Sequence, residues 1–243
     1  MPMLRRFFRG LADIVYPKTC PGCKNTIDKQ TADKFICTSC QAKIKINRPP
    51  FCQKCGRHLE TLNLKINICP GCLKSKLNFD RAFSPCIYEG VIKELIHEFK
   101  YKGKEHLYKP LSKIMIDFIK EYRLPIEYLD LIIPMPLHKT RLREREFNQA
   151  EALSKPIASE FNKTLASSLL IRHRLSRTQT ELPTHKRFEN VANSFSVTKN
   201  NDLINKNLLI IDDVFTTGAT SSEAALALKE AGANKVLILT LAN

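Results

Sequence analysis

The sequence predicts an α/β protein with a parallel sheet, preceded by a small cysteine-rich module. Eight of the nine cysteines stand as four CxxC pairs within residues 20–72, and from about residue 81 short apolar runs alternate with longer helical patterns. Strands that alternate with helices usually form a parallel sheet covered by helices. A chain of 243 residues holds one standard domain and an appendage, so we expect two units, 1–80 and 81–243.

The first sixteen residues mix arginines with apolar side chains, which predicts a short helix packed on the first cysteine module. Arg9 and Asp13 interrupt its apolar run, so it does not have the form of a signal peptide, and no apolar stretch in the chain approaches 18 residues. We therefore expect no transmembrane segment and a cytoplasmic protein. Peripheral contact of residues 3–15 with the inner face of the membrane is the open alternative.

The four CxxC pairs form a duplicated module, because every cysteine of the second set lies 32 positions after its counterpart. Four thiolates are the number that a closed tetrahedral zinc site needs, and reduced cytoplasmic cysteines favour metal over disulfides. A redox CxxC would more usually stand singly at the head of a helix. The sequence predicts two structural zinc ions, paired consecutively, with interleaved pairing left open; the ligands are Cys20, Cys23, Cys37, Cys40, Cys52, Cys55, Cys69 and Cys72.

The remaining chain is interpreted as alternating helices and strands. Apolar side chains recur every three or four residues from Leu107 to Tyr122, which predicts a helix with one buried face. Cys86 stands alone in an apolar segment and is expected to be buried. The other predicted elements are a strand at 129–133 that ends at Pro134, a helical stretch through Arg141 to Gln149, a strand at 208–211, a helix that ends near Ala231 and a strand at 235–241.

The chemistry is clearest where the predicted strand 208–211 ends. Ligands of parallel α/β sheets bind beyond the carboxyl ends of strands, and the turn that follows opens a helix whose free N–H groups attract anions. Threonine hydroxyls add donors, and Gly218 lets the backbone approach the anion. Two carboxylates would repel a phosphate but accept hydrogen bonds from sugar hydroxyls. A phosphorylated ribose suits both, and its predicted contacts are Asp212, Asp213, Thr216, Thr217, Gly218, Ala219 and Thr220.

This segment resembles the phosphoribosyl pyrophosphate (PRPP) motif of type I phosphoribosyltransferases, in which apolar residues, two acids and a Thr-Gly loop follow one another. Three further segments, together with the double CxxC module, resemble the ComF family of competence proteins: Pro134-Met135-Pro136-Leu137, Arg145-Glu146-Phe147-Asn148-Gln149 and Arg177-Thr178-Gln179-Thr180. One departure is Glu146, where the family usually has glycine.

The resemblance implies a type I phosphoribosyltransferase-like sheet behind a double zinc ribbon. It implies that the two aspartates hold the ribose hydroxyls, that residues 216–220 hold the 5′-phosphate and that 134–138 border the pyrophosphate. Residues 172–193 would then form a loop that covers the ligand. If the domain is an enzyme, Mg²⁺ would bind with PRPP and basic residues would neutralise the departing pyrophosphate. The sequence identifies no catalytic residue and no acceptor.

Lysine and arginine exceed the acids by 15, which favours polyanionic partners. Basic residues interleaved with aromatic ones are typical of single-stranded nucleic-acid grooves. The predicted DNA contacts are Lys100, Lys102, Arg141, Arg143, Arg145, Arg174 and Arg177.

We therefore expect a cytoplasmic DNA-uptake protein that binds single-stranded DNA and a PRPP-like ligand, and that hands the strand to a helicase or recombination protein. A true phosphoribosyltransferase with an unknown base or amine acceptor is the alternative. A third hypothesis makes the zinc modules docking surfaces for protein partners.

Overall fold

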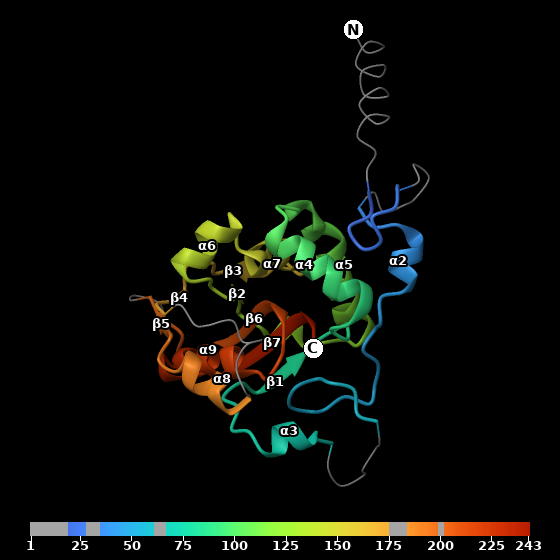
Figure 1. Cartoon of the computed structure of the whole chain (residues 1–243). Helices are drawn as coiled ribbons and strands as arrows, with labels where there is room; N and C mark the ends of the chain where they lie inside the picture. The colour runs from blue at the N-terminus through green and yellow to red at the C-terminus, as the bar shows by residue number, and fades with distance from the viewer. Residues whose placement is uncertain (1–18, 28–34, 61–66, 175–183, 199–201) are drawn as a thin grey trace.

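The structure is a computed structural model that describes residues 19–27, 35–60, 67–174, 184–198 and 202–243. The labels follow Figure 1. The strands are β1 (Arg81–Phe83), β2 (Leu131–Pro134), β3 (Thr164–Leu165), β4 (Leu170–Arg172), β5 (Phe195–Val197), β6 (Asn207–Val214) and β7 (Lys235–Ala242). The α-helices are α2 (Thr38–Ala42), α3 (Pro70–Leu73), α4 (Gly90–Tyr101), α5 (Tyr108–Glu121), α6 (Lys139–Arg145), α7 (Gln149–Glu160), α8 (Thr184–Val191) and α9 (Ala219–Glu230).

The core of the fold is a five-stranded sheet in the order β1-β7-β6-β2-β3, with every neighbouring pair parallel. β4 and β5 form a separate antiparallel pair. The predicted α/β class with a parallel sheet is therefore confirmed.

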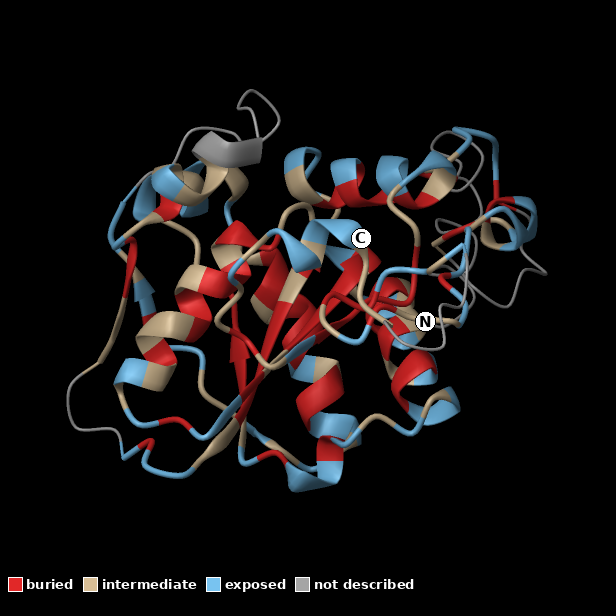
Figure 2. Cartoon of the chain, turned by 90° about the horizontal axis from the view of Figure 1, so that it is seen from below, coloured by how far each residue is buried: buried red, intermediate tan, exposed pale blue. Residues whose placement is uncertain are grey.

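Helices cover both faces of this sheet. On β6, Leu209 and Ile211 join the apolar cluster that includes side chains of α4, α5 and α7, whereas Leu208 and Ile210 join the cluster that contains α9. This alternation is the period of two that a strand imposes. In Figure 2 the buried residues follow the central strands and the inward sides of the flanking helices, so β6 and β7 are buried on both faces.

The cysteine-rich segment packs against the sheet rather than standing apart from it. Its backbone runs beside β1, an edge strand, and the donors Asn47 N, Ile87 N and Ala82 N reach carbonyls across the boundary at 2.7–2.9 Å. Hydrogen bonds along an edge strand shield backbone groups that would otherwise pair with another chain. In Figure 1, α2 lies on the side of α4 and α5, while α3 lies at the opposite side of the molecule.

Several predicted boundaries differ from the structure. The strand predicted at 208–211 continues to Val214, because its ladder with β7 extends as far as the pair Val214 and Ala242. The single helical stretch predicted through Arg141 to Gln149 is two helices, because Glu146 takes the left-handed conformation (φ 67°) that ends α6.

Other expectations are confirmed, and some fall outside the described residues. The helix predicted over 107–122 is α5, and Cys86 is fully buried. The predicted N-terminal helix lies outside the described residues, as does the whole segment Arg177-Thr178-Gln179-Thr180. Within the part of the chain that is described, no helix combines the length and the apolar character needed to cross a bilayer.

Candidate functional site

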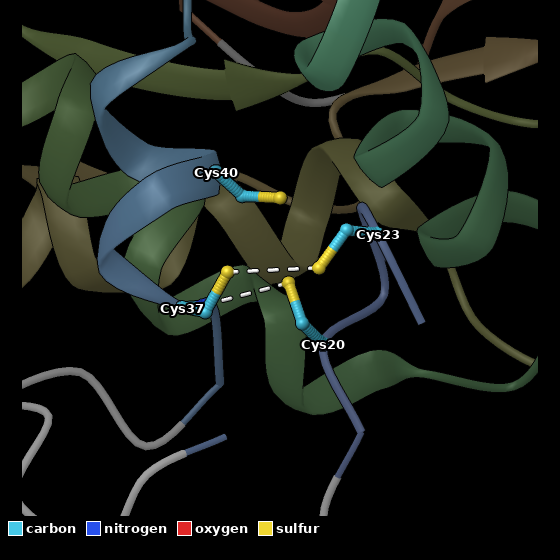
Figure 3. A group of neighbouring side chains, drawn as sticks. All are labelled: Cys20, Cys23, Cys37 and Cys40. Atoms are coloured by element: carbon cyan, nitrogen blue, oxygen red, sulfur yellow. Dashed lines mark hydrogen bonds between the residues drawn. The ribbon is translucent and has the colours of Figure 1, made fainter. Parts of the chain in front are cut away.

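The eight paired cysteines gather into two groups of four. In each group the four sulfur atoms lie within 4.8 Å of one another, and the members are those of consecutive pairing: Cys20, Cys23, Cys37 and Cys40, then Cys52, Cys55, Cys69 and Cys72. Figure 3 shows the first group, with the four sulfurs directed toward a common centre. The structure thus brings together the consecutive sets and not the interleaved ones.

The two groups have the same local geometry, as the 32-residue offset predicts. An antiparallel bridge joins Thr19 to Thr26 in the first module and Phe51 to His58 in the second. In each module the N–H of the third cysteine points at the sulfur of the first, at 3.4 and 3.3 Å. The helices α2 and α3 begin at equivalent positions. The duplication in sequence is therefore a duplication in space.

The geometry of both groups fits a zinc ion. The distances Cys23 Sγ–Cys37 Sγ and Cys55 Sγ–Cys69 Sγ are both 3.7 Å. Zinc–sulfur bonds of about 2.3 Å at a tetrahedral centre place sulfurs roughly 3.8 Å apart. Four thiolates leave no open position for substrate or water, so these are structural centres that stabilise short modules with little core of their own.

The candidate ligand site lies at the carboxyl end of β6. Pro134 of β2 pairs with Ile211 of β6, so the β2–α6 connection begins beside the two aspartates. Strand alternation directs Asp213 to the face covered by α4, where Lys100 Nζ lies 2.7 Å from its Oδ1. Asp212 therefore faces the opposite side, and its Oδ1 accepts the Asp213 N–H at 2.8 Å.

Burial is the main cause that raises the pKa of Asp212, to about 7, and the charge of Asp213 raises it further. Lys100, the Asp213 N–H and Arg172 act in the opposite direction without cancelling the increase. Ionising Asp212 beside Asp213 is therefore energetically unfavourable. Such a pair is typical of a site where hydroxyl donors or a cation bind.

After Asp213 the chain turns sharply and opens α9. Gly218 has φ 79° and precedes the first helical residue, Ala219, whose N–H lies 3.4 Å from Thr217 Oγ1. A Cβ on Gly218 would lie 2.5 Å from Cζ of Phe215, so glycine is required by both its backbone angle and its neighbour. The turn therefore leads directly into the N-terminus of α9, and helix N-termini are common anion sites.

Basic side chains surround this end of the sheet. The charge of Arg172, at the end of β4, interacts with Asp212, and the charges of Arg141 and Arg145 on α6 act on Arg172 in turn. Arg145 connects α6 to α4, because its Nη2 lies 3.2 Å from Tyr101 Oη and its guanidinium lies over the Tyr101 ring. Cations from three elements thus converge near the acidic pair.

The residues predicted to contact DNA divide into two kinds. Lys102 and Arg143 are exposed and are held by no ion pair within the described residues. Arg174 is also exposed, although its Nη1 donates to the Ala192 carbonyl at 3.2 Å. The others contact side chains of the protein itself: Lys100 pairs with Asp213, Arg141 pairs with Glu144 on the surface of α6, and Arg145 bonds to Gln149 and Tyr101. Arg177 lies outside the described residues.

Three interactions of this site were not predicted from the sequence. Arg57, in the second cysteine module, donates from its Nη2 to the Thr216 carbonyl at 3.3 Å. Lys100 pairs with Asp213, and the charge of Arg172 acts on Asp212. The two residues of each pair are far apart in sequence. Strand alternation could have suggested the Lys100–Asp213 pair, but only if the position of α4 had been known.

Comparison with known proteins agrees with this architecture. The model of the double zinc ribbon domain matches residues 11–76. The chain is 26% identical to competence protein F of Haemophilus influenzae, over 92% of this chain and 96% of that protein. It is 29% identical to competence protein ComFC of Bacillus subtilis, over 82% and 80%. It is 26% identical to the DNA utilization protein YhgH of Escherichia coli K12, over 85% and 89%.

Two solved structures overlap with part of the chain. One is the glutamine PRPP amidotransferase from B. subtilis, with 17% identity and a TM-score of 0.34 over 57% of this chain and 26% of that one. The other is described as the allosteric regulatory enzyme of purine biosynthesis, with 21% identity and a TM-score of 0.29 over 45% and 21%. The chain spans about a quarter of the length of these enzymes or less, and overlap of this extent says nothing about activity.

The resemblance predicted from the motifs thus extends over most of the chain and most of its relatives. The two four-cysteine centres coincide with the double zinc ribbon, and the parallel sheet carries the acidic pair and the glycine turn that the motif predicts. Over most of its length the chain is thus similar to competence and DNA utilization proteins at 26–29% identity, and it combines a double zinc ribbon with a parallel α/β domain.

Proposed function

We propose that this protein acts in the uptake of DNA, that it binds single-stranded DNA on the basic surface beside α4 and α6, and that it binds a PRPP-like phosphorylated ribose at the end of β6. The names of the relatives, competence protein and DNA utilization protein, support the general role. A cytoplasmic location, and a helicase or recombination protein as the recipient of the strand, belong to the same proposal.

The observation that carries the ligand proposal is that an acidic pair and a turn suited to bind an anion lie together at the carboxyl end of β6. Loop N–H groups and threonine hydroxyls would receive the 5′-phosphate, and the carboxylates would accept hydrogen bonds from the ribose hydroxyls. Mg²⁺ would add positive charge beside the pyrophosphate. The raised pKa of Asp212 supports this role, because a cation or hydroxyl donor would relieve the charge held there.

The DNA proposal depends on exposed cations near the same end of the sheet. Lys102 follows α4 directly, Arg143 lies on α6, and the half-exposed Tyr101 ring lies between these helices in contact with Arg145. An aromatic side chain beside cations can stack on a base while the cations hold the phosphates.

The test is fluorescence anisotropy of a labelled single-stranded oligonucleotide over a salt series. Charge reversal of two exposed residues, Lys102→Glu with Arg143→Glu, is expected to weaken binding about tenfold or more and to reduce the salt dependence. The matched control reverses two exposed cations of the cysteine-rich segment that take part in no ion pair among the described residues, Lys43→Glu with Lys76→Glu, and should leave affinity nearly unchanged. Equal effects of the two pairs would contradict a localised DNA surface.

A true phosphoribosyltransferase is the second candidate, favoured by the acidic pair and turn alone. It requires release of pyrophosphate from PRPP with Mg²⁺ in the presence of a suitable acceptor. Asp212→Asn with Asp213→Asn should abolish that release. If the protein binds PRPP but releases no pyrophosphate with a broad panel of bases and amines, the site is a binding site and the enzyme hypothesis fails.

A further inference from the structure

The second zinc module contacts the candidate phosphate loop, and the first does not share that contact among the described residues. Arg57 stands two residues after Cys55, and its Nη2 donates to the carbonyl of Thr216 at 3.3 Å. Its counterpart at the offset of 32 is Asn25, whose module packs beside α4 and α5 instead. The two modules have the same internal geometry but different neighbours.

The position of Arg57 is fixed by an extensive set of contacts. The Arg57 carbonyl accepts the Cys52 N–H at 2.8 Å within the turn that carries the zinc ligands. Gly56, with φ 71°, presses against the sheet so closely that a Cβ would lie 2.4 Å from the Ala82 carbonyl oxygen. The buried Asn47 amide donates to the Gly56 carbonyl at 2.8 Å. The turn is therefore anchored on the zinc side and on the sheet side.

The segment after the module also supports the loop. The fully buried Phe79 ring packs edge-on against Phe215, the residue over Gly218, with centroids 5.8 Å apart. Asn78 binds Ser222 in the first turn of α9, with its backbone N–H 3.0 Å and its Nδ2 3.1 Å from Ser222 Oγ. Asn78 and Phe79, which lie between the second cysteine set and β1, thus contact both the turn and the start of the helix.

We propose that Arg57 is a positioning residue of the phosphate loop and that the second zinc module, not the first, determines the affinity of that loop for a phosphorylated ribose. This inference rests on the proposed function. The Thr216 carbonyl oxygen would repel an anion if it faced the ligand. The hydrogen bond from Arg57 keeps this oxygen directed toward the guanidinium instead. A guanidinium carries five N–H donors, and only one of them is used in this contact, so Arg57 also brings positive charge to the anion.

The experiment measures ribose 5-phosphate and PRPP with Mg²⁺ by isothermal titration calorimetry on the full chain. Arg57→Ala is expected to weaken both ligands about fivefold, because it removes one charge-assisted hydrogen bond at an exposed position. Arg57→Lys should recover part of the loss, since it restores the charge but not the planar fork. Lys74→Ala removes an exposed cation from the same module and should have little effect.

Because the module is duplicated, equivalent ligands of the two zinc centres can be replaced in two matched variants. Cys69→Ser and Cys37→Ser change equivalent ligands, and metal content measured by mass spectrometry reports the loss of one ion in each. Cys69→Ser should weaken ligand binding at least as much as Arg57→Ala, whereas Cys37→Ser should leave binding within about twofold of the parent. If Cys69→Ser fails to fold, Arg57→Ala and Arg57→Lys still decide the matter.

The outcomes separate this inference from the proposed function. If the parent protein binds neither ligand, the ligand proposal itself fails. If the parent binds and Arg57→Ala binds equally well, the ligand proposal stands and the role of Arg57 is refuted. If Arg57→Lys is as weak as Arg57→Ala, and Arg57→Ala also lowers the unfolding free energy, the contact is structural, and the positioning role is overturned.

Discussion

Replacing Asp212 with asparagine is expected to stabilise the folded protein near and above neutral pH and to abolish the proposed binding of a phosphorylated ribose. Burial, followed by the charge of Asp213, raises the pKa of Asp212 from 3.8 to about 7. A tenfold change in proton affinity corresponds to about 1.4 kcal/mol, so ionising this carboxyl costs the folded state at most about 4 kcal/mol.

The sign follows from linkage. Because the folded pKa is the higher one, the favourable contribution is complete below the unfolded pKa of 3.8 and is lost as the pH rises to about 7. Asp212 keeps partial contact with solvent, which reduces the cost to about 2 kcal/mol. Asparagine cannot ionise, and its carbonyl can still accept the Asp213 N–H that lies 2.8 Å from Asp212 Oδ1.

The assay is urea unfolding at pH 5.5 and pH 8.0, with zinc present so that the metal centres stay loaded. Asp212→Asn should raise the unfolding free energy at both values, by about 1 kcal/mol more at pH 8.0 than at pH 5.5. Asp213→Asn is the control. It should be destabilising, because it deprives the largely buried Lys100 of a partner at 2.7 Å. If Asp212→Asn lowers the unfolding free energy, or raises it equally at both pH values, the ionised Asp212 does not destabilise the folded protein.

Three further predictions concern the turns and the metal centres. Gly218→Ala should lower the unfolding free energy by about 2 kcal/mol or more, measured by urea titration, because its φ is 79° and its Cβ would lie 2.5 Å from Phe215; a neutral result would mean that the turn rearranges freely. Glu146→Gly should raise that free energy by about 0.5–1 kcal/mol, since Glu146 has φ 67°, and a loss would show that its side chain makes a compensating contact. Metal analysis should find two zinc ions per chain, and chelation should unfold both modules by circular dichroism; full folding after chelation would contradict a structural role.

Features that depend on local chemistry and periodicity could be predicted from the amino-acid sequence. The exact 32-residue offset of the cysteines predicted two similar centres, because ligand spacing and turn residues are local properties. Alternating strands and helices predicted the parallel sheet, and the acids followed by a Thr-Gly turn predicted an anion site at a strand end. The left-handed conformation of Glu146 was not predicted, since glutamate rarely adopts it.

Contacts between residues that are distant in sequence could not be predicted, because they depend on how the elements pack. Lys100 and Asp213 are 113 positions apart, and Arg57 and Thr216 are 159 apart, so no local pattern relates them. Their contacts depend on the face that each strand residue takes and on how the two equivalent modules pack. The sequence predicted that both aspartates follow the strand, whereas in the structure they lie within β6, and strand alternation directs them to opposite faces. Sequence patterns specify elements and their chemistry, whereas the packing of those elements decides which charges share a site.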